Sequence, residues 1–84
     1  MDEHTHYDLI DKIREISKKT EGVIDTEKCF VRKAGMQFHV DLHIIVNGQI
    51  SVREGHNIAH KLQNVLGKEI PELSNILIHV EPNE

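Results

Sequence analysis

The chain is short of the residues that cross-link or rigidify small proteins. It has one cysteine, Cys29, no tryptophan, and only 4% aromatic residues among its 84. A single cysteine excludes an intramolecular disulfide, so a reducing compartment suits the chain. Because aromatic rings are scarce, we expect an aliphatic core in which Cys29, without a CxxC partner, is a small buried hydrophobe rather than a ligand.

Basic residues and long apolar runs are also in short supply. Ten Lys and Arg stand against fourteen Asp and Glu, which leaves a net charge of −4 with histidine neutral. The chain therefore has no basic surplus with which to neutralise phosphates, and we expect no nucleic-acid partner. No apolar run approaches the length of a bilayer span and no signal peptide is visible, so we expect no direct membrane insertion of this chain. An acidic chain with seven histidines is better matched to cations.

The remaining composition is typical of one soluble globular domain. The hydrophobic fraction is 38% and the charged fraction 29%, which argues against disorder. The length leaves room for a single domain over residues 1–84, with 1–5 and 83–84 expected to be loose. Met1 is either a native start or the start of an excised domain, and the sequence leaves that open.

Residues 37–46 alternate apolar and polar over their whole length, which predicts a half-buried strand. One face carries only apolar side chains, those of Phe38, Val40, Leu42, Ile44 and Val46. The other face carries His39, Asp41 and His43. Side chains two apart on a strand lie about 7 Å from each other and project the same way. Imidazole and carboxylate are ligands of zinc and similar divalent metals, so this face is a candidate metal site.

Two helices and two more strands are predicted around this stretch. A helix is expected over about 5–21, with Thr5 as N-cap and Gly22 as terminator. A β-rich segment follows from Val23 to Arg32, and a turn that contains Gly35 should join it to 37–46 as an antiparallel hairpin.

The second half of the chain has clearer boundary signals. Ser51 and Glu54 form a capping box that opens a helix over about 51–67, which Gly67 is expected to end. A last strand is expected over 75–81, stopped by Pro82. Its side chains divide into an inward set of Ile76, Ile78 and Val80 and an outward set of Leu77, His79 and Glu81.

The order helix, strand, strand, helix, strand predicts an α+β fold in two layers. Each helix has one apolar stripe and the three-stranded mixed sheet has one apolar face, so both helices should cover the same face. The arrangement resembles a ferredoxin-like unit that lacks its first strand.

The uncovered face of such a sheet would collect imidazoles and carboxylates from at least two strands. Its members would be His39, Asp41, His43, His79 and Glu81, joined by Glu27 if the odd residues of the first strand point outward. A divalent cation would relieve the repulsion and satisfy the donors and acceptors of such a group. A solvated polar face that binds nothing stays an equal alternative.

The other histidines are weaker candidates. His56 and His60 are one helical turn apart, a spacing that can chelate a metal, but two exposed side chains on a polar helix face is the simpler interpretation. His4 and His6 are expected to be solvated.

Several segments together resemble the cytoplasmic C-terminal domain of cation diffusion facilitator transporters, which export zinc and related metals in exchange for protons. They are Gly22-Val23, Phe38 to His43, Ser51 to Ala59 and Ile78 to Pro82. The resemblance spans about residues 10–82. It implies a metallochaperone-like αββαβ fold, a homodimer that binds metal at its interface, and a regulatory role beside a membrane domain that this chain lacks.

The resemblance also assigns roles to individual residues. His43 matches the family's strand histidine ligand, His79 the histidine of the last strand, and Glu81 stands where an acidic ligand is expected. His56 matches a histidine that in some members reaches a metal across the dimer. Glu27 falls where some members carry a first-strand histidine. His39 and Asp41 have no counterpart and are candidates from the strand pattern alone.

The resemblance thus implies a regulatory domain of a divalent-cation efflux transporter, on the cytoplasmic side of the membrane in which the full-length protein would lie. Its partners would be a second copy and the transmembrane domain of the same transporter. Zinc is the preferred ion, and nickel, cobalt, cadmium, manganese or iron could occupy the same ligands. Alternatives are a free-standing cytosolic zinc-binding, metallochaperone-like protein or a metal-free protein-interaction domain. An enzyme is not expected, because no Gly-rich anion loop and no nucleophile–base pair is visible.

Overall fold

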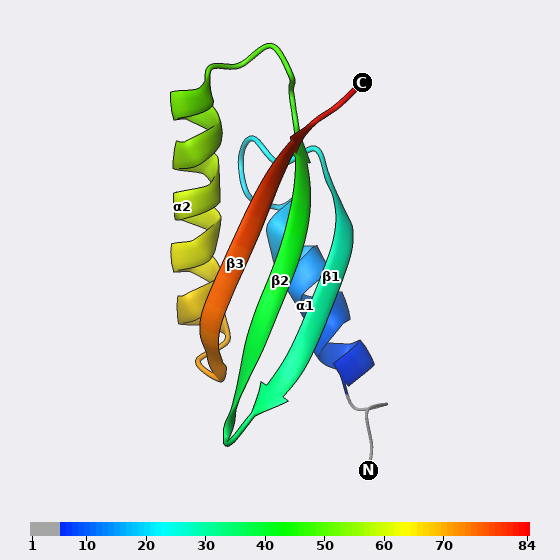
Figure 1. Ribbon diagram of the computed structural model, residues 1–84, viewed down its shortest axis with the longest axis vertical. Helices are drawn as coiled ribbons and strands as arrows, with labels where there is room; N and C mark the ends of the chain where they lie inside the picture. Colours follow the sequence, from blue (N-terminus) through cyan, green and yellow to red (C-terminus); the bar gives the residue numbers. More distant parts are fainter. Residues whose placement is uncertain (1–5) are drawn as a thin grey trace.

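The computed structural model describes residues 6–84, which form two helices and one three-stranded sheet (Figure 1). In chain order the elements are α1 (His6–Lys18), β1 (Asp25–Ala34), β2 (Gln37–Val46), α2 (Val52–Glu69) and β3 (Leu73–Pro82). The predicted α+β class and the order of the elements are confirmed. The proposed N-cap Thr5, His4 and the expected looseness of 1–5 lie outside the described residues.

The sheet is mixed, with β2 in its centre. Strand β1 pairs antiparallel with β2 through a tight turn, in which Gly35 takes a φ of +66°. Strand β3 pairs parallel with the other edge of β2, and α2 forms the crossover that parallel neighbours require. The predicted hairpin is confirmed.

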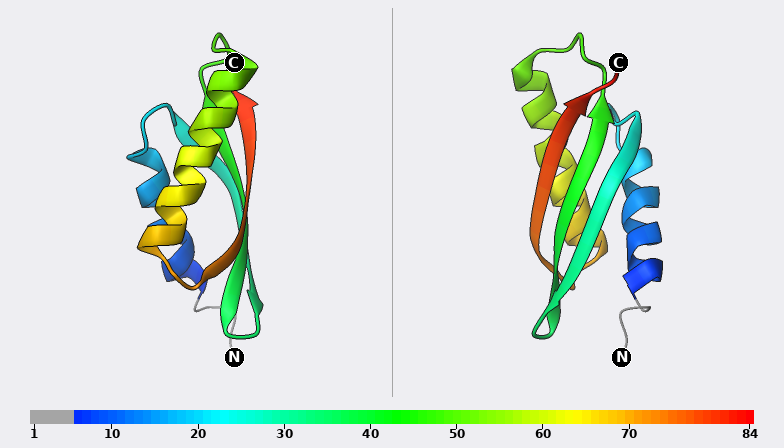
Figure 2. Two further views of the ribbon diagram at one scale, coloured as in Figure 1. Left: turned by 90° about the vertical axis from the view of Figure 1, so that its left-hand side faces the viewer. Right: turned by 45° about the vertical axis from the view of Figure 1, so that its right-hand side comes forward.

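Both helices pack on the same face of the sheet, as the amphipathic patterns predicted (Figure 2, left). Leu42 and Ile44 of β2 are fully buried there against Ile13 of α1 and Leu62 and Leu66 of α2. Within residues 6–84, no helix lies over the opposite face. The apolar half of the alternation on β2 therefore builds the core, and the polar half is left on the open face.

The helix ends differ from the predicted ones at two glycines. Helix α1 ends at Lys18, and Gly22 lies in the following loop with a φ of +98°. A Cβ at Gly22 would come within 2.6 Å of Ile58 Cδ1, so glycine is needed there for packing as well as for the turn.

Helix α2 does not end at Gly67 but continues to Glu69, and the Ile70 N–H donates to the Leu66 carbonyl. A glycine inside a helix costs about 1 kcal/mol, and the burial of Leu66 and Ile70 at this end outweighs it. At the other end the Ser51–Glu54 capping box is present in both directions. Within residues 6–84, neither helix is both long enough and apolar enough to cross a bilayer.

The two faces of the sheet should respond differently to the same substitution. Leu42→Ala, on the buried face, should lower the free energy of unfolding by roughly 2–5 kcal/mol, because it leaves a cavity in the core. Leu77→Ala is the matched control, since Leu77 is 55% exposed on the open face, and it should cost less than about 1 kcal/mol. Urea unfolding of both variants checks this. Equal losses would contradict the one-sided core.

Candidate metal centre

The open face brings the predicted histidines and acids of β2 and β3 together. The parallel register places His43 directly beside His79, and their rings stack with centroids 4.3 Å apart and planes 16° from parallel. The side chain of His43 is 19% exposed and that of His79 44% exposed. Alternation along β2 puts Asp41 on the same face as His43.

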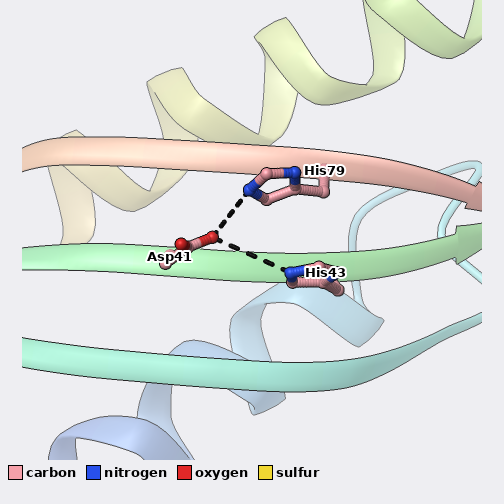
Figure 3. Close-up of side chains that lie close together, drawn as sticks. All are labelled: Asp41, His43 and His79. Atoms are coloured by element: carbon pink, nitrogen blue, oxygen red, sulfur yellow. Dashed lines mark ion pairs between the residues drawn. The ribbon is translucent and has the colours of Figure 1, made fainter.

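Asp41, His43 and His79 form the first cluster of candidate ligand atoms (Figure 3). The Oδ1 atom of Asp41 lies 2.8 Å from Nε2 of His79 and 3.9 Å from Nε2 of His43. Figure 3 shows the carboxylate directed towards both rings.

The position of Asp41 Oδ1 is costly without a further partner. This oxygen itself has almost no exposed surface, although the Asp41 side chain as a whole is 45% exposed, and it accepts no hydrogen bond from residues 6–84. Its close contact with His79 is an ion pair that requires a protonated imidazole. A buried carboxylate oxygen that accepts no hydrogen bond is strongly unfavourable. One carboxylate and two imidazoles are a donor set that suits a divalent cation, so the residues present fit a metal.

Glu27, His43 and Glu81 form a second cluster on the other side of the same imidazole. His43 Nδ1 lies 2.6 Å from Glu81 Oε2, and this hydrogen bond holds the pKa of Glu81 below its ordinary value. Candidate ligand atoms of all three residues lie within 4.8 Å of one another. His43 therefore belongs to both clusters, with one ring nitrogen facing each.

The hydrogen bond to Glu81 decides what the other nitrogen of His43 can do. An ionised carboxylate is only an acceptor, so Nδ1 must carry the proton that the two atoms share. In the neutral imidazole, Nε2 is then left with its lone pair on the side of Asp41 and His79. This is the usual arrangement of metal-binding histidines, in which a carboxylate orients the ring from behind. In this geometry Glu81 acts on the ring of His43.

Two of the predicted residues, His39 and His56, lie outside both clusters, and Glu27 reaches its cluster for a reason that the sequence did not predict. His39 is on the open face, but its Nδ1 lies 3.1 Å from Arg32 Nη2 and it joins neither cluster. His56 is exposed on α2. Glu27 faces outward although the odd-numbered Cys29 of the same strand is buried in the core. The condition stated for Glu27, that the odd residues of this strand point outward, is therefore wrong.

The remaining histidines and the cysteine have other surroundings. The rings of His56 and His60 lie 4.8 Å apart on α2. His6 is half-buried with its ring edge-on to Phe38, at 5.2 Å, so the expectation that it is solvated is wrong. Cys29 packs in the core, where burial raises the pKa of its thiol, and it is the small buried hydrophobe that was expected.

The polar centre has an apolar rim that sequence patterns did not single out. Phe30 of β1 is 60% exposed and Leu77 of β3 is 55% exposed, and both line a hollow of about 330 Å³ with His39 and Asp41. Alternation predicts the outward direction of Leu77, but the position of Phe30 depends on the phase of β1, which the sequence left uncertain.

Comparison with known proteins points to one family. The family described as "Cation efflux protein, cytoplasmic domain" matches residues 6–83. Metal tolerance protein C1 of Arabidopsis thaliana is 29% identical over 73 residues, which are 87% of this chain and 16% of that protein. The manganese efflux system protein MneP of Bacillus subtilis is 21% identical over 82 residues, or 98% of this chain and 28% of that protein. The chain thus spans less than a third of the length of either relative.

Solved structures share the fold. A nickel form of a MamM CTD variant superposes with a TM-score of 0.90 at 19% identity, covering 93% of this chain and 99% of that one. A cadmium form of another variant gives a TM-score of 0.91 at 19% identity, over 94% and 99%. Because the family profile matches nearly the whole chain, this chain belongs to the family of cation efflux protein cytoplasmic domains.

Proposed function

We propose that this chain is the metal-responsive regulatory domain of a divalent-cation efflux transporter. In this proposal it binds a metal through Asp41, His43 and His79, pairs with a second copy, and acts on a membrane domain from the cytoplasmic side. The observation that carries the proposal is the buried Oδ1 of Asp41, which accepts no hydrogen bond from residues 6–84 and lies 2.8 Å and 3.9 Å from the imidazole nitrogens of His79 and His43.

The donor set favours some ions over others. Two imidazoles and one carboxylate suit zinc, and also nickel, cobalt and cadmium. Iron would use the same residues, whereas manganese prefers oxygen donors and fits the Glu27–His43–Glu81 cluster better. Among similar proteins, one relative is named a manganese efflux protein and two structures are nickel and cadmium forms. We propose zinc as the ion of the Asp41 cluster.

Metal binding would favour the pairing of two copies by reducing the charge repulsion between them. Each copy carries a net charge of −4, so two copies repel each other. A cation held on the open face reduces that repulsion, and an ion that binds the paired form more tightly shifts the population towards it. The exposed His56, which is outside both clusters of its own chain, is available as a ligand from a second copy.

The relatives favour a module of a longer protein over a free-standing carrier. The chain covers 16% of one curated relative and 28% of another, which leaves room in those proteins for a membrane domain. A metal-free interaction domain is the second candidate, because Phe30 and Leu77 expose apolar surface on the same face as the clusters. We assign no catalytic activity, because the family is a domain of efflux proteins.

Zinc binding should depend on Asp41 but not on His39, which lies two positions earlier on the same face of the strand. Asp41→Asn keeps the shape of the side chain but removes its charge, and it should weaken zinc binding at least about tenfold. His39→Ala, on the same strand face but outside the clusters, should change the affinity less than about twofold. Isothermal titration calorimetry gives both affinities. Equal affinity in the wild type and in His43→Ala/His79→Ala would refute the site.

Zinc should also shift the chain towards dimers. Sedimentation velocity of the metal-free protein should show a larger monomer fraction than the zinc-loaded protein at the same concentration. His56→Ala should weaken this shift more than His60→Ala does, because only His56 is assigned to the second copy. A zinc-bound protein whose sedimentation is unchanged would leave metal binding intact and remove the regulatory part of the proposal.

Acid should weaken zinc binding, because protons compete with zinc for the ligand atoms.

The lowered pKa of Glu81 has a separate consequence in the metal-free protein. Its stabilising effect is present above its ordinary pKa of 4.5 and is lost as the pH falls through the lower folded value. Glu81→Gln should therefore flatten the decline in melting temperature below about pH 4.5. The exposed Glu72→Gln should not, and an identical acid decline in wild type and Glu81→Gln would contradict the assignment.

A further inference from the structure

Strand β1 contains an irregularity directly opposite His43. Thr26 pairs with Ile44 and Cys29 pairs with Leu42, so Glu27 and Lys28 together face the single residue His43 of β2. This two-against-one arrangement is a β-bulge.

The bulge changes which side chains of β1 face outward. After the bulge, towards the C-terminal end of β1, Cys29 is buried in the core and Phe30 is exposed, so the odd-numbered residue Cys29 points inward. With unbroken alternation, Glu27 would also point into the core. The extra residue reverses the phase, and Glu27 instead faces outward within 4.8 Å of His43 and Glu81.

Arg14 of α1 contacts the bulge from the helical layer. Its Nη1 donates to Thr26 Oγ1 at 2.8 Å and to the backbone carbonyl of Glu27 at 3.0 Å. The bulge leaves Glu27 without a register partner on β2. The guanidinium thus supplies a donor to the very residue that the bulge takes out of the sheet ladder, and hydrogen bonds from a charged donor are the stronger kind.

We infer that Arg14 is a positioning residue of the metal centre, which holds the bulge so that Glu27 stays beside His43 and Glu81. This inference rests on the proposed metal-binding function. Arg14 lies in the helical layer and touches the backbone of Glu27, so it acts through Glu27 rather than on a ligand itself. The bulge is therefore a point at which α1 contacts a residue of the site.

The first test needs no metal. Arg14→Met removes the donor and keeps a long side chain, and Lys12→Met is the control, an exposed lysine on the same helix. In NMR spectra of the metal-free protein, the nuclear Overhauser contact between the Glu27 side chain and the His43 ring should fall at least about threefold in Arg14→Met and stay unchanged in Lys12→Met. An unchanged contact in a folded Arg14→Met protein overturns the inference.

A conservative variant covers the case in which Arg14→Met does not fold. Arg14→Lys retains the charge and one donor group, so it should keep more of the Glu27–His43 contact than Arg14→Met does but less than the wild type. If Arg14→Met is unfolded, a full contact in Arg14→Lys would show that the paired hydrogen bonds of the guanidinium to Thr26 and Glu27 are not needed, and would overturn the positioning role.

The second test asks whether Arg14 works through Glu27. Glu27 is outside the Asp41 cluster but lies beside Glu81 and His43, so it would act on zinc through the ring of His43. Arg14→Met should then weaken zinc binding about tenfold, as the loss of an outer partner of a metal site does. In a Glu27→Gln background the same change should have almost no further effect, whereas in an Asp41→Asn background its effect should persist. A tenfold loss that persists in Glu27→Gln would overturn the inference, because it would place the effect elsewhere.

The two proposals fail separately. If the wild type binds no zinc, the proposed function falls, and the metal-free NMR contact still decides whether Arg14 holds Glu27 in place. If zinc binds but the Glu27–His43 contact is unchanged in Arg14→Met, the metal site stands and the positioning role of Arg14 is refuted.

Discussion

The period of two along β2 is the constraint on which the rest of the structure depends. β2 is the central strand, so it is paired on both edges and cannot slide without breaking both sets of hydrogen bonds. Its inward side chains, such as Leu42 and Ile44, are fully buried under the two helices. A shift of one residue would exchange these with Asp41 and His43 and place charged groups in the core. The burial of the core therefore also determines which groups meet on the open face.

His43 connects the two clusters that result. One nitrogen is hydrogen-bonded to Glu81, and the other lies on the side of Asp41 and His79. Because a neutral imidazole has one lone pair, whatever happens at one nitrogen changes what the other can do. A change in the hydrogen bond between His43 and Glu81 would therefore alter the proton or lone pair that the same ring presents to Asp41 and His79. The metal centre proposed at this ring rests on the family match and on the buried oxygen of Asp41.

The helical layer also contributes to the open face. Both helices lie on the far side of the sheet, yet Arg14 hydrogen-bonds to the backbone of Glu27 at the bulge. Through that contact α1 and β1 are linked at the one position of β1 that supplies a candidate ligand. The clusters therefore depend on both layers of the fold, although all their candidate ligand atoms come from the sheet.

The sequence by itself determined the features that arise from local periodicity. Strand β2 runs over the predicted residues 37–46, and the capping box at Ser51 and the outward direction of His43, His79 and Glu81 follow from spacing within one element. Only the tertiary structure decided where α2 ends, how Glu27 faces outward, and which nitrogen of His43 meets Glu81. These features depend on groups far apart in the chain. The burial of Ile70 in the core decides where α2 ends, the contact of Arg14 accompanies the bulge at Glu27, and the pairing of β2 with β3 places His43 beside the last strand. A periodic pattern records which side of an element is buried, but it contains no information about the residue that a distant segment places opposite it.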